Sequence, residues 1–182
     1  MKEAVIVSAA RTPIGKAYRG AFNNLEAPSL ASFAVKEAIS RAGIDPAEID
    51  DCLFGASIQQ GTQGSNLARQ IAIASGLPAS VSGMTLDRQC SSGVMTIATA
   101  AKQIIVDGAP IVLAGGVESV SLAQNDKMNL FRAKDPLVLA HSPDFYMPML
   151  ETAEFVAKKF GISRERPAEY ALNSQYHTHS TQ

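Results

Sequence analysis

The sequence contains no tryptophan and only 6% aromatic residues, and its charges nearly cancel. Sixteen Lys and Arg residues stand against 17 Asp and Glu residues, which gives a formal net charge of -1. A protein that follows a nucleic-acid backbone needs a basic surface, and one that binds unpaired bases needs exposed aromatic rings. The composition therefore argues against a nucleic-acid partner.

Cysteine and long apolar runs are also scarce. Two cysteines, Cys52 and Cys90, cannot build a disulfide framework, and their different apolar contexts favour free thiols in a reducing compartment. The first apolar run is soon interrupted by Arg11 and Pro13, unlike the longer apolar core of an export signal. No stretch approaches the roughly 18 apolar residues of a membrane helix. We expect a soluble, cytoplasmic protein without a membrane partner.

The sequence does contain apolar residues at spacings that predict alternating strands and helices. Hydrophobic residues make up 46% of the sequence, so the chain can bury a core. Its length of 182 residues predicts one large domain, or one domain with an appendage. The order βαβαβαβ predicts an α/β fold, a layered domain with mostly parallel core strands covered on both faces. The expected strands are 4–7, 51–57, 81–86 and 111–114, and the expected helices are 28–42, 66–75 and 91–106.

Three local patterns refine this expectation. Asp45, Pro46 and Glu48 are typical of a capping box around one short turn, and Asn66 can cap the second helix. The helix 91–106 has Lys102 as its only charged residue, so we expect it to be buried on nearly all sides.

The composition changes after the fourth strand. We expect an α/β core over 1–119, followed over 120–182 by the start of a loop subdomain with helices at 149–160 and from 164 onward. The last helix reaches the end of the sequence without a glycine stop or an apolar partner face. This pattern predicts that the chain is truncated within the subdomain.

The segment 84–95 is the most informative for chemistry. Cys90 lies where a strand ends and a helix begins, and the positive end of the helix dipole there favours a thiolate. Ser91, Ser92 and Gly93 are small enough for a substrate carbonyl to approach, and the Cys90 N–H can face a developing oxyanion. The arrangement suits acyl transfer. By spacing alone, Cys90 can equally be a small buried packing residue.

Four blocks resemble thiolases and occur in the order found in that family. They are SAARTPIG at 8–15, DRQCSSG at 87–93, AGGVESVS at 114–121 and MPMLETAE at 147–154. Several motifs in register are far more specific than one short pattern. The chain is thus similar to the N-terminal half of a thiolase, an acetyl-CoA acetyltransferase or 3-ketoacyl-CoA thiolase of fatty acid metabolism.

The resemblance implies a reversible Claisen condensation. It makes Cys90 the nucleophile that takes the acyl group from an acyl-CoA, with Glu118 and Ser119 organising the floor of the site. Coenzyme A thioesters are then substrates, and no covalently bound cofactor is expected. The resemblance also implies a homo-dimer or tetramer, with 81–86 as the central dimer strand and 124–136 either a solvated loop or an oligomer contact.

In the family, the proton transfers come from a Gly-His-Pro-like motif and a Cys-x-Gly motif of a C-terminal half. Neither motif is in this sequence. We therefore expect the missing C-terminal half to be a required partner and this chain alone to be inactive. Two alternatives remain open: a decarboxylating condensing enzyme of related fold, and a non-catalytic remnant that only folds and dimerises.

The remaining candidate residues lie in less specific patterns, which favour structural roles for most of them. Asp87 replaces an asparagine common in the family, and its carboxylate either disfavours the Cys90 thiolate or pairs with Arg88. We expect Cys52 to be a core residue and no residue to bind a metal. His141 is interpreted as a loop residue and Arg11 as lying outside the site, while His177 and His179 are too far apart around a helix to share a metal.

Overall fold

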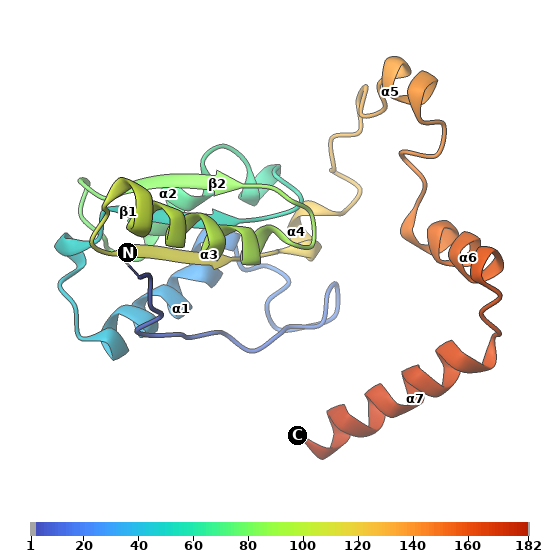
Figure 1. Ribbon diagram of the computed structural model, residues 1–182, viewed down its shortest axis with the longest axis horizontal. Helices are drawn as coiled ribbons and strands as arrows, with labels where there is room; N and C mark the ends of the chain where they lie inside the picture. The colour runs from blue at the N-terminus through green and yellow to red at the C-terminus, as the bar shows by residue number, and fades with distance from the viewer. Residues whose placement is uncertain (1–2, 182) are drawn as a thin grey trace. The chain divides into compact units, whose positions relative to one another are not determined.

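The computed structural model describes residues 3–181 (Figure 1). Contacts divide the chain into two compact units, the first ending at Asn129 and the second beginning at Leu130, and each is described by itself. None of the helices within residues 3–181 has the length and apolar character that crossing a membrane requires.

The first unit is built on a parallel sheet of three strands. These are β1 (Asp51–Gly55), β2 (Ser82–Leu86) and β3 (Val112–Gly116), in the order β2-β1-β3, with Asp51 in register with both Ser82 and Val112. The central strand is the most deeply buried, as its near-continuous apolar sequence predicts. The predicted α/β class with a parallel sheet is confirmed.

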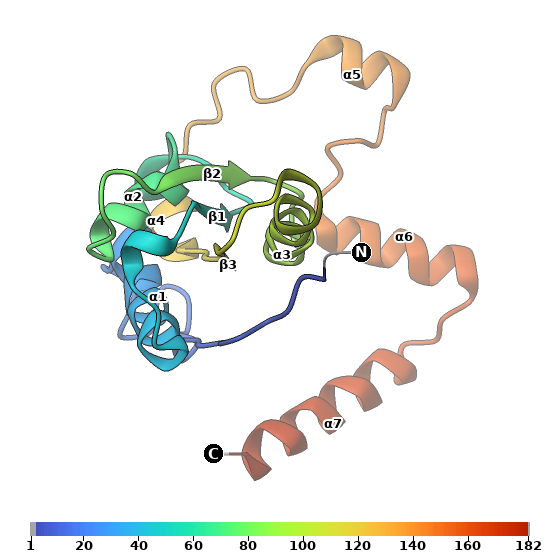
Figure 2. The same cartoon turned by 60° about the vertical axis from the view of Figure 1, so that its left-hand side comes forward.

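Helices cover both faces of the sheet. Helix α2 (Leu67–Ala74) packs on β1 and β2 with α1 (Ala27–Ala42) beside it, whereas α3 (Ser92–Lys102) packs on β1 and β3 from the opposite side (Figure 2). The main core lies between the sheet and the first two helices. Its buried members are Ala27, Ala31, Val35, Ile39, Ile49, Cys52, Phe54, Ala56, Leu67, Ala68, Ile71, Ala72, Leu77 and Val81.

Local signals place the ends of these elements. Gly43, at φ 64°, ends α1 in the left-handed conformation that glycine adopts at low cost. The Asn66 side chain accepts the Arg69 N–H at 3.1 Å, which caps α2 as predicted. The capping box around the short 3₁₀ turn η1 (Pro46–Glu48) is also confirmed.

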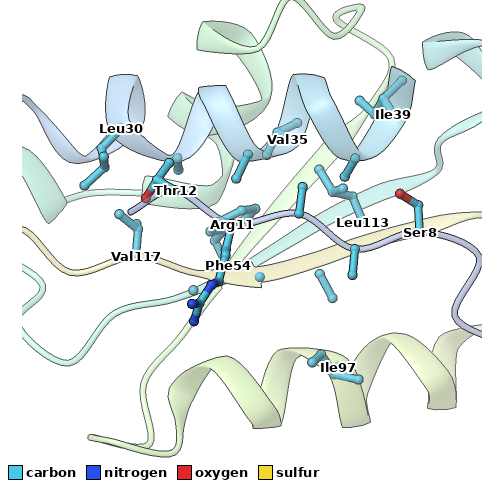
Figure 3. A pocket seen from close by; sticks show the side chains of 18 of the residues that line it. Ser8, Arg11, Thr12, Leu30, Val35, Ile39, Phe54, Ile97, Leu113 and Val117 are labelled. Carbon is cyan, nitrogen blue, oxygen red and sulfur yellow. The ribbon is translucent and has the colours of Figure 1, made fainter. Parts of the chain in front are cut away.

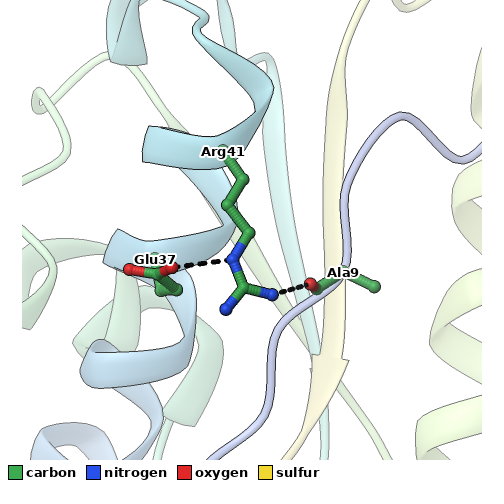
Figure 4. A network of polar contacts seen from close by, with 3 residues as sticks. All are labelled: Ala9, Glu37 and Arg41. Carbon is green, nitrogen blue, oxygen red and sulfur yellow. Dashed lines mark hydrogen bonds and ion pairs between the residues drawn. The ribbon is translucent and has the colours of Figure 1, made fainter.

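The predicted strand 4–7 is wrong. This segment is extended but pairs with no strand, and Val5, Ile6 and Val7 are 70%, 77% and 71% exposed. A polar contact tethers the segment to α1, because Arg41 donates to the Ala9 carbonyl at 2.9 Å and to Glu37 at 2.7 Å (Figure 4). The residues have strand-forming side chains, but a strand also needs an adjacent backbone edge, and a cavity separates this segment from β3.

The expectation that 91–106 is buried on nearly all sides is also wrong. The α-helix ends at Lys102 and continues as one π turn, η3 (Gln103–Asp107), which Gly108 terminates at φ 83°. Val94 and Val106 are 63% and 77% exposed, and Ile97, which lines the cavity beside the N-terminal segment, is 46% exposed. The sheet covers one side of α3, and within the described part of the first unit no element covers the other.

Two further groups of helices follow β3. The short α4 (Val120–Ala123) lies beside the loop around Tyr18, whose N–H and hydroxyl bond to Ser121 and Gln124. The second unit contains α5 (Pro136–His141), α6 (Met149–Phe160) and α7 (Glu165–Ser180), none of which has a buried residue. The predicted helices at 149–160 and from 164 onward are confirmed.

Candidate active site

Cys90 lies in the five-residue connection between β2 and α3. Its thiol is free and the residue is exposed, immediately before the residue that caps α3. A buried packing role for Cys90, which spacing alone had left open, is therefore wrong. Exposure leaves the Cys90 thiol open to a molecule that approaches from solution.

The turn before Cys90 has an unusual backbone that neighbouring polar groups hold in place. Gln89 has φ 49°, in the left-handed region that non-glycine residues rarely adopt. The Asp87 carboxylate accepts the Gln89 N–H at 2.7 Å. The buried Ser92 hydroxyl accepts the Arg88 N–H at 2.9 Å and donates to the Gln89 carbonyl at 2.6 Å. These three bonds stabilise the conformation that presents Cys90.

The predicted pairing of Asp87 with Arg88 is wrong. Among residues 3–181, no ion pair joins these two side chains. The carboxylate instead caps the turn through the Gln89 N–H, an arrangement in which a short acidic side chain bonds the backbone two residues on. The effect of its charge on the Cys90 thiolate stays a prediction.

Closely packed glycines bring the start of α3 against the carboxyl ends of β1 and β3. A Cβ added to Gly55 would lie 2.6 Å from the Ser92 backbone, and one added to Gly116 would lie 3.2 Å from the Gly93 Cα. The buried Thr96 hydroxyl also lies 2.9 Å from the Gly115 carbonyl oxygen, which ties α3 to β3. Cys90 is thus held at the carboxyl end of the sheet, where open α/β folds place their ligand sites.

Glu118 and Ser119 follow β3, and the Gln63 side chain bonds to both of them. The Glu118 carboxylate accepts the Ser57 N–H at 2.8 Å and the Ser57 hydroxyl at 2.7 Å, while its other oxygen accepts the Gln63 amide at 2.5 Å. Gln63 also accepts the Ser119 N–H and donates to the Ile58 carbonyl at 2.7 Å. The network fixes the loop that follows β3 against the loop that follows β1.

Gln63 is the residue of this network that sequence reasoning missed. It is fully buried, although it lies in the polar, glycine-punctuated segment before α2. A buried amide must satisfy both its donor and its acceptor groups, and Gln63 does so with three partners from two loops. No local pattern in the sequence signals this role, because Glu118 and Ser119 are 55 and 56 residues away.

Comparison with known proteins decides the family. Residues 4–182 match the family model described as the thiolase N-terminal domain. The chain belongs to the thiolase family. It is 42% identical over 174 residues to a 3-ketoacyl-CoA thiolase of Bacillus subtilis (strain 168), and the match covers 96% of this chain and 44% of that protein. The predicted family is confirmed.

Two further relatives agree with this thiolase assignment. An acetyl-CoA acetyltransferase of Cupriavidus necator is 40% identical over 185 residues, covering 96% of this chain and 47% of its own length. The crystal structure of the Bacillus anthracis acetyl-CoA acetyltransferase matches with a TM-score of 0.77 at 36% identity, covering 94% of this chain and 45% of that one. This thiolase-family chain spans about half the length of the relatives it matches.

The second cysteine of this thiolase-family chain, Cys52, is buried, whereas Cys90 is exposed. Cys52 is fully buried in the core, as predicted. Burial, and secondarily the neighbouring Asp51 carboxylate, raises the pKa of Cys52 from 9.0 to about 12, although the Arg69 charge opposes the shift. At neutral pH the Cys52 thiol stays protonated, so it is a poor nucleophile and a poor general acid or base.

No histidine lies in the unit that contains Cys90. His141, at the end of α5, and His177 and His179, on α7, all belong to the second unit. The residues that the structure describes include no group of three or more side chains able to hold a metal ion. Arg11 lines a cavity between the N-terminal segment and β3 (Figure 3). Cys90 is not among the residues that line this cavity.

Proposed function

We propose that this chain supplies the nucleophile of a thiolase-type acyl transfer, with acyl-CoA and CoA as its small-molecule partners. The observation that supports the proposal most directly is the exposed Cys90 thiol on a turn held by Ser92, at the N-terminus of α3. Membership of the thiolase family, whose matched relatives are named for acetyl-CoA acyl transfer, supports the same reaction class.

In the proposed first step, Cys90 reacts as its thiolate, and its Sγ attacks the thioester carbonyl carbon of an acyl-CoA. A carbon–sulfur bond to Cys90 forms, the bond to the CoA sulfur breaks, and the CoA thiolate leaves. The Cys90 N–H stabilises the charge that develops on the carbonyl oxygen. Ser91 and Gly93 leave room for the carbonyl, and Glu118 with Ser119 forms the floor through the Gln63 network.

In the second step, the acyl group passes from Cys90 to the enolate carbon of acetyl-CoA. Reversal of this step is the thiolysis of a 3-ketoacyl-CoA by CoA. Forming the enolate removes a proton from acetyl-CoA, so a general base is required, and the reverse direction requires a general acid. The first unit contains no histidine, and the Cys52 thiol is protonated and buried, so neither group is available there.

We infer that the base and acid come from polypeptide outside residues 1–182, and that these residues alone are catalytically inactive. The exposed apolar side of α3 is consistent with a further half of the enzyme packing there. No bound cofactor is required by this scheme, because the thioester itself activates the carbonyl and the α-carbon.

We also propose a homo-oligomer, a dimer or tetramer, assembled through β2. This strand is at one edge of the sheet and pairs only with β1 among the described residues. An unpaired edge readily associates with a second edge, which two-fold symmetry can supply. The two free cysteines are consistent with a cytoplasmic location.

A thiolysis assay tests the proposed function. Loss of the acetoacetyl-CoA enolate absorbance is followed for residues 1–182 alone and for these residues fused to the part of the B. subtilis relative that they do not match. We expect turnover only from the fusion, and none when the fusion carries Cys90→Ser. Turnover by residues 1–182 alone, or by the Cys90→Ser fusion, would overturn the proposal.

A further inference from the structure

The outer edge of β2, on the side away from β1, lies beside the start of α2. Ser82 donates its N–H to the Asp50 carbonyl at 3.2 Å, and Leu86 accepts the Ala56 N–H at 3.3 Å, so the even-numbered residues of β2 bond to β1. In a parallel pair the alternate residues direct their N–H and C=O groups to the other side. The residues that direct these groups to the outer edge are Val81, just before the strand, Gly83 and Thr85.

Two side chains from the start of α2 bond to carbonyls on this edge. The Asn66 amide donates to the Gly83 carbonyl at 2.7 Å. The Arg69 guanidinium donates to the Val81 carbonyl with one nitrogen and to the Ala79 carbonyl at 3.0 Å with the other. A guanidinium holds its donors in a fixed planar fork, which suits two acceptors at once. The amino-terminal half of the edge is thus already bonded to side chains of the same chain.

Close packing of α2 on β2 holds these side chains in place. A Cβ added to Gly83 would lie 2.6 Å from the Arg69 backbone nitrogen, so a glycine is needed where the helix approaches the strand. The Thr85 hydroxyl accepts the Ala68 N–H at 3.0 Å and donates to the Asn66 Oδ1 at 3.1 Å. Asn66 is therefore fixed by bonds to two outward residues of the strand.

The edge remains open at Thr85. The Val81 N–H donates to the Pro78 carbonyl at 3.1 Å, so both outward groups of Val81 are bonded. Gly83 keeps only its N–H, because its carbonyl accepts the Asn66 amide. Within the part of the chain that the structure describes, no group bonds to the outward N–H or carbonyl of Thr85. Of these three residues, Thr85 alone offers both a donor and an acceptor.

We propose that Asn66 and Arg69 determine how a second copy of this chain pairs with β2: antiparallel, with Thr85 of each copy on the two-fold axis. A residue on that axis faces its own counterpart, so it needs one free donor and one free acceptor. Pairing centred on Gly83 would displace both side chains from their carbonyls. Charged side chains on an edge strand are a known device against unwanted pairing. The proposal rests on the proposed homo-oligomer and not on the chemistry of Cys90.

Disulfide trapping tests this register. With Thr85 on the axis, Met84 of one copy faces Leu86 of the other in a non-hydrogen-bonded pair, with Cα atoms ~4.5 Å apart, a separation that a disulfide can bridge. The first cysteine pair, Met84→Cys with Leu86→Cys, is therefore placed in one chain that also carries Cys90→Ser. On mild oxidation this variant should form a cross-linked dimer, measured on a non-reducing gel.

The second cysteine pair, Ser82→Cys with Met84→Cys, is the matched control. It has the same spacing along the strand, but its cysteines face each other only when Gly83 is on the axis. We expect at least about tenfold more cross-linked dimer from the first pair than from the second. Met84→Cys alone and Leu86→Cys alone should not cross-link, because each requires its own position to be on the axis.

A further variant removes the two side chains that bond the edge. Asn66→Ser keeps a residue able to cap α2 but loses the amide donor, and Arg69→Met keeps an unbranched side chain without donors. Together they should raise cross-linking of the second cysteine pair at least about fivefold, because pairing centred on Gly83 becomes accessible. Arg19→Met is the control for charge, since Arg19 is exposed and its side chain bonds to no described residue. Circular dichroism checks that each variant folds.

The outcomes separate this proposal from the proposed homo-oligomer. Equal cross-linking of the two cysteine pairs, or a cross-link from either single cysteine, would overturn the Thr85 register, and this comparison does not depend on the Arg69 variant. Unchanged cross-linking of the second pair after loss of both side chains would overturn the role of Asn66 and Arg69. A dimer on gel filtration that the first pair does not trap contradicts this proposal alone, whereas a monomer without any cross-link contradicts both.

Discussion

The hydroxyl of Ser92 lies 2.6 Å from the Gln89 carbonyl oxygen and spans the turn that carries Cys90. The same hydroxyl oxygen accepts the Arg88 N–H, so one buried side chain satisfies a donor and an acceptor of the turn. Together with the Asp87 carboxylate, which accepts the Gln89 N–H, Ser92 stabilises the left-handed conformation of Gln89. Presentation of Cys90 therefore depends on a residue two positions further along the chain.

Ser92→Ala should slow modification of Cys90 by iodoacetamide several-fold. Loss of the hydroxyl leaves the Arg88 N–H without its partner, at a cost of about 1–3 kcal/mol, and frees the turn. Thr99→Ala is the control, because it removes a hydroxyl bonded within the same helix but away from the turn. Rates are measured by intact mass, and equal rates in the two variants would contradict the role of Ser92.

Cys90, and not Cys52, should be the thiol that short acyl-CoA thioesters and haloacetamides modify near neutral pH. Cys90 is exposed at a helix start, whereas Cys52 is buried with its pKa raised to about 12. Peptide mapping of the folded protein locates the label, and Cys90→Ser should abolish it. Preferential labelling of Cys52 would remove the assignment of Cys90 as nucleophile.

The raised pKa of Cys52 predicts a loss of stability in alkaline solution. A thiol that stays neutral in the folded protein but ionises in the unfolded chain stabilises the fold fully below the unfolded pKa of 9.0. That contribution decreases as the pH rises above this value toward the folded pKa of about 12. Urea unfolding from about pH 8 to about pH 11 should show a steeper decline for the wild type than for Cys52→Ala. Parallel declines would show that Cys52 does not ionise on unfolding.

Gly55→Ala should destabilise the first unit by about 1–3 kcal/mol, because the added Cβ would lie 2.6 Å from the Ser92 backbone. Gly93→Ala is the matched control for stability, since its Cβ would meet no atom closer than 3.9 Å in a helix that favours alanine. The free energy of unfolding is measured in urea. Equal stability of the two variants would show that α3 moves away from β1 without cost.

The protein should be at least a dimer at micromolar concentration, because β2 has a free edge. Light scattering coupled to gel filtration should give at least twice the chain mass of 19.2 kDa. A soluble monomer that persists over a range of concentrations would exclude assembly through β2.

Much of this architecture was predictable from local sequence. The capping box at Asp45, the Asn66 cap and the parallel strands depend on neighbouring residues and on apolar runs, so they could be identified without coordinates. Cys90 could likewise be placed between a strand and a helix. The resemblance of four blocks in register identified the family, which the comparisons confirm.

Other features depend on residues far apart in the sequence. Val5, Ile6 and Val7 have the side chains of a strand, but a strand forms only beside an adjacent strand edge. The cavity beside β3 separates these residues from the edge of that strand. The outer side of α3 is apolar yet exposed, since composition does not specify how many faces of a helix are covered. Gln63 joins loops more than fifty residues apart. Short-range propensity and capping were thus readable from the sequence, whereas burial, strand pairing and the polar network around Glu118 were decided by tertiary packing, because each requires a partner that chain proximity does not supply.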